Sequence, residues 1–189
     1  MENLEIEYKV LVNKKDFNKL LEYLKQKYSF ESFTQTNVYY DTIDEKLHKK
    51  GISLRIRNYE NSKEHLLTLK EKVQVGRLEH EYYVAKNSVR YFPQEIINII
   101  KKNNVDINEI INTARLKTTR TEFKIDDYLL CLDHSSYYKK EDYEIECEAK
   151  SMKTAQMIIS ILLKSLSISY IESNLSKTAR AKEAKKYVK

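Results

Sequence analysis

The sequence predicts an α+β protein: a closed, eight-stranded antiparallel β-barrel with a polar, charged interior, flanked by helices. The first observation behind this prediction is a series of about eight short segments in which apolar and polar residues alternate, with turn residues at hairpin spacing between them. The second is that most of these segments carry charge on one face only. The third is a long amphipathic helix near the C-terminus. A barrel that turns its charged face inward and its apolar face toward helices accounts for all three.

Length and composition favour one domain over residues 1–189. Hydrophobic residues make up 41% of the chain and charged residues 33%, which excludes a disordered protein. No apolar run approaches the roughly 18 to 20 residues of a membrane span, and residues 1–5 lack a secretory signal, so we expect a cytoplasmic protein. The net charge of +6 predicts an anionic partner, and nucleic acid, a membrane surface and small phosphates all fit that charge.

Cysteine and histidine offer no obvious metal site in the sequence. Cys131 and Cys147 lie in apolar, strand-like segments without ligand spacing, and we expect both to be reduced packing residues. His80 has no second histidine at ligand spacing, so a packing role is the better interpretation.

The first predicted strand covers residues 4–10. A period of two places Glu5, Glu7 and Lys9 on one face and apolar residues on the other. Asn13 then has the chemistry of a helix N-cap, and apolar residues at helical spacing predict a helix of about four turns after it.

Four further strands are predicted at residues 36–42, 52–57, 66–72 and 77–82. The second and the fourth of these alternate, so that each carries its charges on one face, and in the third Thr68, Lys70 and Lys72 share a face. Those charges are Arg55 and Arg57, then Lys70 and Lys72, then Arg77, Glu79 and Glu81.

A helical excursion then interrupts the strands without ending the domain. Pro93 is placed to start one short helix and Asp106 to cap a second helical piece. Strands resume at residues 116–123, 128–133 and 143–148. Arg120, Glu122 and Lys124 share one face of the first of these strands. Glu144, Glu146 and Glu148 share one face of the last.

The chain closes with helical signals. Ser151 is an N-cap for the long helix, whose apolar stripe predicts a core-facing side. Lys177 and Arg180 stand three residues apart, on a helix or at its start. The stripe comprises Ala155, Ile158, Ile159, Leu162, Leu163 and Leu166.

The predicted strands fall into an acidic set and a basic set. Acids concentrate on the first and eighth strands, and bases on the third, fourth and sixth. A solvated face would usually mix signs within each strand, because like charges on neighbouring strands repel. The pattern therefore favours an interior that binds divalent cations on the acids and a polyanion on the bases. A half-buried sheet with a solvated charged face is the alternative.

These segments resemble the CYTH family, the triphosphate tunnel metalloenzymes. The opening EIEYK has the form of that family's E-x-E-x-K hallmark, and the resemblance covers nearly the whole chain. It is strongest for the bacterial stand-alone members. The motifs that follow in family order are YYD, LRIR, LTLK, TTRTEF, LD, EIECE and SKTAR.

The resemblance also implies roles for individual residues. The metal ligands would be Glu5, Glu7, Asp133, Glu144, Glu146 and Glu148. The substrate-binding residues would be Lys9, Arg55, Arg57, Lys70, Lys72, Arg120, Lys177 and Arg180, and the catalytic residues Glu5, Glu7, Lys9 and Lys70. The turn at residues 134–143 lacks the glycine common in relatives, which leaves open which of the three glutamates on the eighth strand bind metal.

By resemblance, the expected fold is an eight-stranded tunnel, and the expected activity is metal-dependent hydrolysis of the terminal phosphoanhydride bond of a small triphosphate. Inorganic triphosphate is the first candidate, with thiamine triphosphate or a nucleoside triphosphate as others. Two Mg²⁺ or Mn²⁺ ions would serve as cofactors. We expect a monomer or homodimer without a membrane partner. Nucleic acid is a weaker candidate partner than a small triphosphate. The alternatives are an adenylyl cyclase on the same fold, and a non-catalytic module that binds polyphosphate or RNA and needs the bases but not the paired acids.

Overall fold

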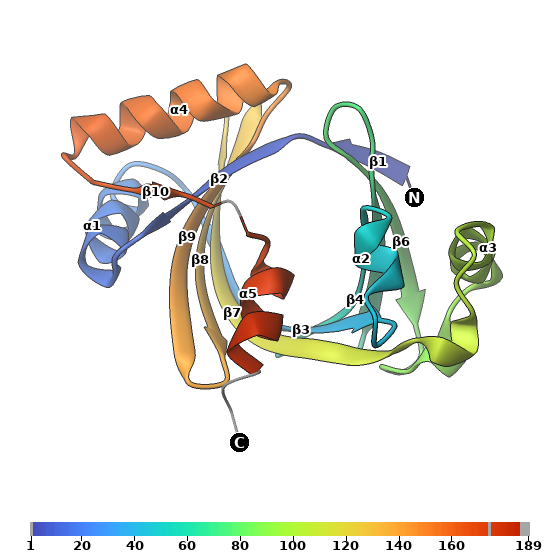
Figure 1. Cartoon of the computed structure of the whole chain (residues 1–189). Helices are drawn as coiled ribbons and strands as arrows, with labels where there is room; N and C mark the ends of the chain where they lie inside the picture. The colour runs from blue at the N-terminus through green and yellow to red at the C-terminus, as the bar shows by residue number, and fades with distance from the viewer. Residues whose placement is uncertain (1, 174, 186–189) are drawn as a thin grey trace.

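The computed structural model describes residues 2–173 and 175–185 and confirms the α+β class. Its centre is one curled antiparallel sheet, a half-barrel of ten strands in this part of the chain, in the order β1-β6-β5-β4-β3-β7-β8-β9-β2-β10 (Figure 1). The strands are β1 (Glu2–Glu5), β2 (Glu7–Val12), β3 (Glu31–Asp41), β4 (Ile52–Tyr59), β5 (His65–Lys72), β6 (Arg77–Val84), β7 (Ile111–Ile125), β8 (Tyr128–Tyr137), β9 (Lys140–Glu148) and β10 (Ile171–Glu172). The helices are α1 (Lys14–Lys25), α2 (Lys46–Lys49), α3 (Gln94–Lys102), α4 (Met152–Ser165) and α5 (Lys177–Lys185), with 3-10 turns η1 (Val89–Tyr91) and η2 (Ile107–Glu109).

The strand count differs from the predicted eight for two reasons. The first predicted strand is divided at Ile6: β1 pairs with β6, whereas β2 pairs with β9. The short segment from Glu5 to Glu7 therefore joins one edge strand of the sheet to a strand beside its other edge. The second addition is β10, which pairs with β2 through two residues, too few to show a period in the sequence.

Two apolar clusters attach helices to the sheet. One joins α1 and α4 to β2, β7, β8 and β9, and the other joins α2 and α3 to β3, β4 and β5. Leu20, Leu24, Ile159 and Leu163 are at most 1% exposed in the first cluster, and burial of each such side chain contributes roughly 1.5–3 kcal/mol. The predicted stripe on α4 is therefore confirmed as core.

The predicted helix caps are also confirmed. The Asn13 side chain accepts a hydrogen bond from the Asp16 amide at 2.9 Å, and the Ser151 hydroxyl accepts one from the Thr154 amide at 3.1 Å. Such caps satisfy amides that have no partner within the helix.

Helix α5 packs through a third, smaller cluster. Its Ala181 and Ala184 contact Tyr39 on β3, Leu116 on β7 and Tyr137 on β8. Tyr39 is the cross-strand partner of Arg55 and Tyr40 belongs to the cluster of α2 and α3, so α5 lies on the opposite face of the sheet from those helices. This face is the one that carries the charges.

Several predicted boundaries are wrong because strand pairing extends the strands. β3 begins at Glu31 and β7 at Ile111, since the two strands pair along their length from Glu31 opposite Glu122 to Asp41 opposite Ile111. The turn predicted over residues 134–143 is confined to the two residues between β8 and β9, where Tyr138 has φ 56°. The ends of these strands depend on pairing between residues that are far apart in the sequence, and local strand propensity carries no information about such pairing.

Among residues 2–173 and 175–185, none of the helices has the length and apolarity of a membrane span.

Gly76, in the turn before β6, supports the segment that carries Glu5. Its φ is +81°, and a Cβ there would lie 2.3 Å from the Glu5 carbonyl oxygen and 3.1 Å from Ile6 Cγ1. Gly76→Ala is therefore expected to cost about 1–3 kcal/mol from backbone strain alone, with displacement of Glu5 in addition. Urea unfolding measures the effect. Gln74→Ala in the same turn is the control, and equal stability of the two variants would contradict the close approach.

Candidate active site

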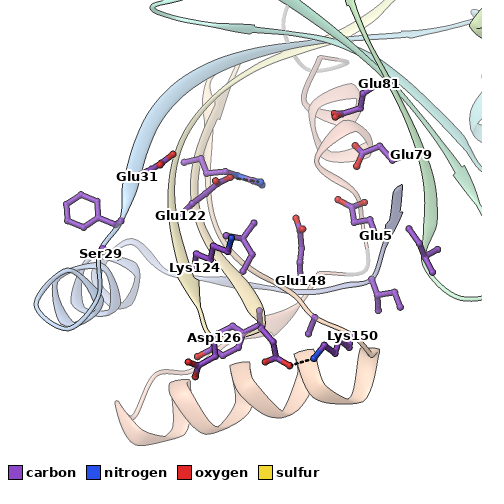
Figure 2. Close-up of a pocket in the computed structure, with 18 of the residues that line it drawn as sticks. Glu5, Ser29, Glu31, Glu79, Glu81, Glu122, Lys124, Asp126, Glu148 and Lys150 are labelled. Carbon is purple, nitrogen blue, oxygen red and sulfur yellow. Dashed lines mark hydrogen bonds and ion pairs between the residues drawn. The ribbon is translucent and has the colours of Figure 1, made fainter. Parts of the chain in front are cut away.

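The charged faces of the strands meet at a cavity of about 930 Å³. Among the residues described, eight carboxylates and five basic side chains line it. In Figure 2, Glu5 and Glu148 point into the cavity, Glu79 and Glu81 lie on one side, and Glu122 lies on the other. The volume falls at the upper end of the range of about 300–1,000 Å³ found for ligand pockets.

Three carboxylates beside the cavity lie close enough to bind one cation; we call Glu5, Glu7 and Glu148 the carboxylate cluster. Glu5 ends β1, Glu7 begins β2, and Glu148 on β9 is the cross-strand partner of Glu7. One oxygen from each lies within 4.8 Å of the others. Burial, and then the charge of Glu5, raises the pKa of Glu148 to about 7, because both disfavour another negative charge. Carboxylate oxygens suit Mg²⁺ and Mn²⁺, so this donor set fits a divalent cation.

Two lysines contact the carboxylate cluster. The Lys70 ammonium on β5 lies 2.6 Å from Glu5. The Lys9 ammonium on β2 contacts Glu7 and lies 3.4 Å from Glu146. Burial alone would lower the pKa of Lys9, but the Glu146 and Glu7 carboxylates raise it above its ordinary value. Both lysines are thus held by carboxylates of the site, and neither is among the residues that line the cavity.

The basic side chains include three arginines, Arg55 and Arg57 on β4 and Arg120 on β7, which we call the arginine group. Arg57 donates to Asn37 at 3.2 Å and to the Tyr59 hydroxyl at 3.4 Å, and no carboxylate of the described chain lies within ion-pair distance of it. Burial, followed by the charges of Arg55 and Arg120, lowers the pKa of Arg57. Positive charge without a compensating carboxylate favours an anion in this part of the cavity.

The other predicted metal ligands lie in a second ion-pair network, which Lys9 links to the carboxylate cluster through Glu146 and Glu7. Arg120 donates two hydrogen bonds of 2.7 Å to Asp133. Lys177 on α5 contacts Asp133 and lies 2.7 Å from Glu146 and 3.1 Å from Glu144. Burial would raise the pKa of Asp133, but Arg120 and Lys177 lower it below its ordinary value. The structure therefore brings together the six predicted ligands in two groups of three.

Arg180 fixes α5 to β9. Its guanidinium donates to Asp142 at 2.6 Å, to Ser173 at 2.8 Å and to the Leu175 carbonyl at 2.7 Å, and it contacts Glu144. Since all three nitrogens are engaged within the chain, the arrangement favours a positioning role for Arg180 over the predicted direct contact with substrate.

Replacing Arg180 is expected to destabilise the protein. Arg180→Ala should cost about 3–5 kcal/mol, because Glu144 has a side chain that is fully buried and loses a charged partner. Urea unfolding of this variant and of Arg115→Ala, an exposed arginine on β7, measures the difference. An Arg180→Ala protein as stable as the control would show that α5 is held by other contacts.

Among the other predicted positions, some border the cavity and some do not. Lys72 is exposed at the end of β5 beside Gly51 and does not border the cavity, and neither does Arg77. Glu79, Glu81, Glu122 and Lys124 line the cavity.

Two polar residues of β3, Asn37 and Tyr39, also belong to the site and were not predicted from the sequence. Asn37 accepts a hydrogen bond from Arg57, and Tyr39 is the cross-strand partner of Arg55 and bonds Thr178 on α5. Burial would raise the pKa of Tyr39, but Arg55 lowers it below its ordinary value. The sequence did contain a signal for these two residues. Because side chains alternate along a strand, Asn37 and Tyr39 lie on the same face.

The packing role is confirmed for one of the two cysteines. Cys131 and Cys147 are free and buried, and Cys147 packs in the cluster with α1 and α4. Cys131 lies on the charged face of β8 instead, opposite Glu146, with its sulfur 4.0 Å from Glu122. His80 is 6% exposed, and its Nε2 lies 3.1 Å from Glu71.

The fold and this cavity define an α+β protein whose curled antiparallel sheet gathers carboxylates and basic side chains around one space. The family model for the CYTH domain matches residues 3–181, and the chain belongs to the CYTH family. The resemblance inferred from the motifs is thereby confirmed.

Individual relatives agree with this assignment. "Putative triphosphatase YjbK" of Bacillus subtilis (strain 168) is 35% identical over 172 residues, which is 88% of each chain. The crystal structure of a "putative adenylate cyclase (bh2851)" from Bacillus halodurans is 32% identical, with a TM-score of 0.82 over 95% of this chain and 97% of that one. HpAC1 from Hippeastrum, a "putative adenylyl cyclase" described as having a dominant triphosphatase activity, shares the fold at 22% identity, with a TM-score of 0.76 over 96% of each chain.

Proposed function

We propose that this protein hydrolyses the terminal phosphoanhydride bond of a small triphosphate with the help of a divalent cation. The observation that carries the proposal is the approach of the carboxylate cluster and the arginine group to one cavity. The name of YjbK, a relative over most of both chains, supports the same activity.

The carboxylate cluster would hold Mg²⁺ or Mn²⁺. A bound ion of this kind supplies electrostatic stabilisation to phosphoryl oxygens and lowers the pKa of coordinated water. A second ion at Asp133, Glu144 and Glu146 is part of the proposal, and it requires these carboxylates to exchange their contacts with Lys177 and Arg120.

The chain's own basic residues would bind and orient the triphosphate. Guanidinium groups match phosphate oxygens in two-point contacts, and Arg57 is available for such a contact because it pairs with neutral groups only. Lys9 and Lys70 pair with carboxylates of the cluster, so they can turn to phosphate when those carboxylates are engaged elsewhere. Neutralising the leaving diphosphate is most of what phosphoryl transfer requires from a protein.

We also propose that the sheet works as a closed, eight-stranded tunnel with a charged interior. The support is the segment from Glu5 to Glu7, which connects the strand beside β6 to the strand beside β9. The reaction would take place in the cytoplasm, in a monomer or homodimer, without a membrane partner.

Adenylyl cyclisation is the second candidate, favoured by the name of the Bacillus halodurans relative. It would use the same metal and phosphate contacts, with the 3′-hydroxyl of ATP as the nucleophile and diphosphate as the leaving group.

A substrate panel tests the proposal and separates the two candidates. Inorganic triphosphate, thiamine triphosphate and ATP are incubated with Mg²⁺ or Mn²⁺, and phosphate, diphosphate and cyclic AMP are all measured. Phosphate release that stops on addition of EDTA supports the hydrolase. Cyclic AMP with equimolar diphosphate supports the cyclase, and the absence of all three products contradicts both.

A further inference from the structure

The YYD motif ends in a carboxylate that the proposed reaction does not use. Asp41 is the last residue of β3, and its side chain is 4% exposed. It accepts hydrogen bonds from the amides of Thr42 at 2.8 Å, Leu47 at 2.9 Å and His48 at 3.2 Å, so it fixes the turn from β3 into α2. Asp41 does not border the cavity. Any role it has in the reaction is therefore exerted through another residue.

Lys182 on α5 is that residue. Its ammonium lies 3.4 Å from Asp41 and 3.1 Å from Glu45, and its side chain is 15% exposed. Within the part of the chain that the structure describes, Lys182 is the only basic side chain at ion-pair distance from Asp41. Glu45 is the N-cap of α2, and its φ of 60° is uncommon outside glycine. We call Lys182, Asp41 and Glu45 the α2 latch, because they tie α5 to the start of α2.

Another side of α5 carries Lys177, which reaches the active site. Lys177 and Lys182 are five residues apart on one helix, which separates their side chains by about 140° around the helix axis and about 7.5 Å along it. Lys177 contacts Asp133 and lies 2.7 Å from Glu146. The helix is thus held by acids on two different sides, one within the site and one outside it.

Apolar packing holds α5 only weakly. In the described helix the buried side chains are Ala181 and Ala184, and a methyl group buries little area, whereas α4 buries isoleucine and leucine side chains. The position of α5 therefore depends on its charged residues. Arg180 fixes the first half of the helix to β9, and Lys182 in the second half joins it to α2.

We propose that Lys182 is a positioning residue of the active site. Held by Asp41 and Glu45 outside the cavity, it fixes α5 and so determines where the Lys177 ammonium lies among the acids of β8 and β9. The effect on catalysis rests on the proposed function, whereas the effect on α5 does not. The aspartate of the YYD motif then serves the reaction by holding Lys182.

Steady-state kinetics with the preferred substrate of the panel test the proposal. Lys182→Met should raise KM about tenfold, the scale of one weakened charged hydrogen bond. Its kcat should change less than about threefold, because Lys177 is displaced for bound substrate and transition state alike. Since KM does not depend on the fraction of enzyme that is folded, a loss of stability in the variant leaves this comparison valid.

Two further variants serve as rescue and control. Lys182→Arg should restore a wild-type KM, because a guanidinium can pair with the same two carboxylates. Lys185→Met removes a charge from the same helix, but Lys185 donates to the Thr113 carbonyl at 3.2 Å and has no carboxylate partner in the described chain. Its KM should stay within about twofold of wild type.

Hydrogen exchange gives a readout that needs no turnover. Lys182→Met should speed exchange of the α5 amides about tenfold or more, while the α4 amides keep their wild-type rates. Equal exchange of α5 in the variant and in wild type would overturn the proposal. So would an unchanged KM in Lys182→Met, a loss confined to kcat, or the same rise in KM in Lys185→Met. If wild type hydrolyses no substrate, the proposed function fails, and the exchange rates alone decide whether Lys182 positions α5.

Discussion

Glu148→Gln is expected to lower metal-dependent phosphate release at least about a hundredfold, the scale of effect seen when a preorganised electrostatic contact is removed from an active site. Glutamine keeps the size of the side chain but removes one of the three charges of the carboxylate cluster. The protein should remain folded, because the substitution relieves repulsion from Glu5 in a half-buried site.

The assay is phosphate release at several Mn²⁺ concentrations. Excess Mn²⁺ should restore part of the activity, since a weakened site fills at higher concentration. Glu60→Gln is the matched control, because Glu60 forms an exposed ion pair with Lys117 and lies outside the cavity. Full activity of Glu148→Gln at low Mn²⁺ would remove the carboxylate cluster from the mechanism.

Arg57→Ala is expected to lower kcat/KM about 10²- to 10³-fold while leaving stability unchanged or slightly higher. Arg57 makes its contacts with Asn37 and Tyr59 and has no carboxylate partner in the described chain. Its removal therefore leaves no buried carboxylate without a counter-charge, and it relieves repulsion from Arg55 and Arg120.

Arg120→Ala provides the contrast in the same arginine group. Its loss leaves Asp133, whose side chain is fully buried, with one charged partner fewer, so the variant should lose about 3–5 kcal/mol of stability as well as activity. Urea unfolding and steady-state kinetics on both variants separate the effects. A strong destabilisation in Arg57→Ala, or wild-type kcat/KM in that variant, would contradict the assignment of Arg57 as a phosphate contact.

For most strands, the sequence predicts which side chains share a face, because side chains alternate between the two faces of a strand. Alternation alone placed Arg55 with Arg57, and both line the cavity. It also placed Glu5, Glu7 and Lys9 together, and Glu7 lies close to Glu5 and contacts Lys9. It was wrong for Ile6, which was expected on the opposite face but borders the cavity beside Glu5. The caps Asn13 and Ser151 were predictable for a different reason: each bonds an amide only three residues further along the chain.

The division of the carboxylates into two groups was not predictable from the sequence. It depends on the register of β2 against β9, which sets Glu7 opposite Glu148 and Lys9 opposite Glu146. It also depends on α5, which brings Lys177 to Asp133 from 44 residues away along the chain. Contacts between residues so far apart in the sequence produce no periodic pattern along it. For the same reason, the first residues of β3 and β7 were predicted wrongly.

The most direct test of the central claim is X-ray diffraction at the manganese absorption edge from crystals grown with Mn²⁺. The account predicts an anomalous peak within about 2.0–2.6 Å of carboxylate oxygens of Glu5, Glu7 and Glu148, the distances at which hard divalent cations bind oxygen. A peak at Asp133, Glu144 and Glu146 alone, with Glu5 still paired to Lys70, would contradict it.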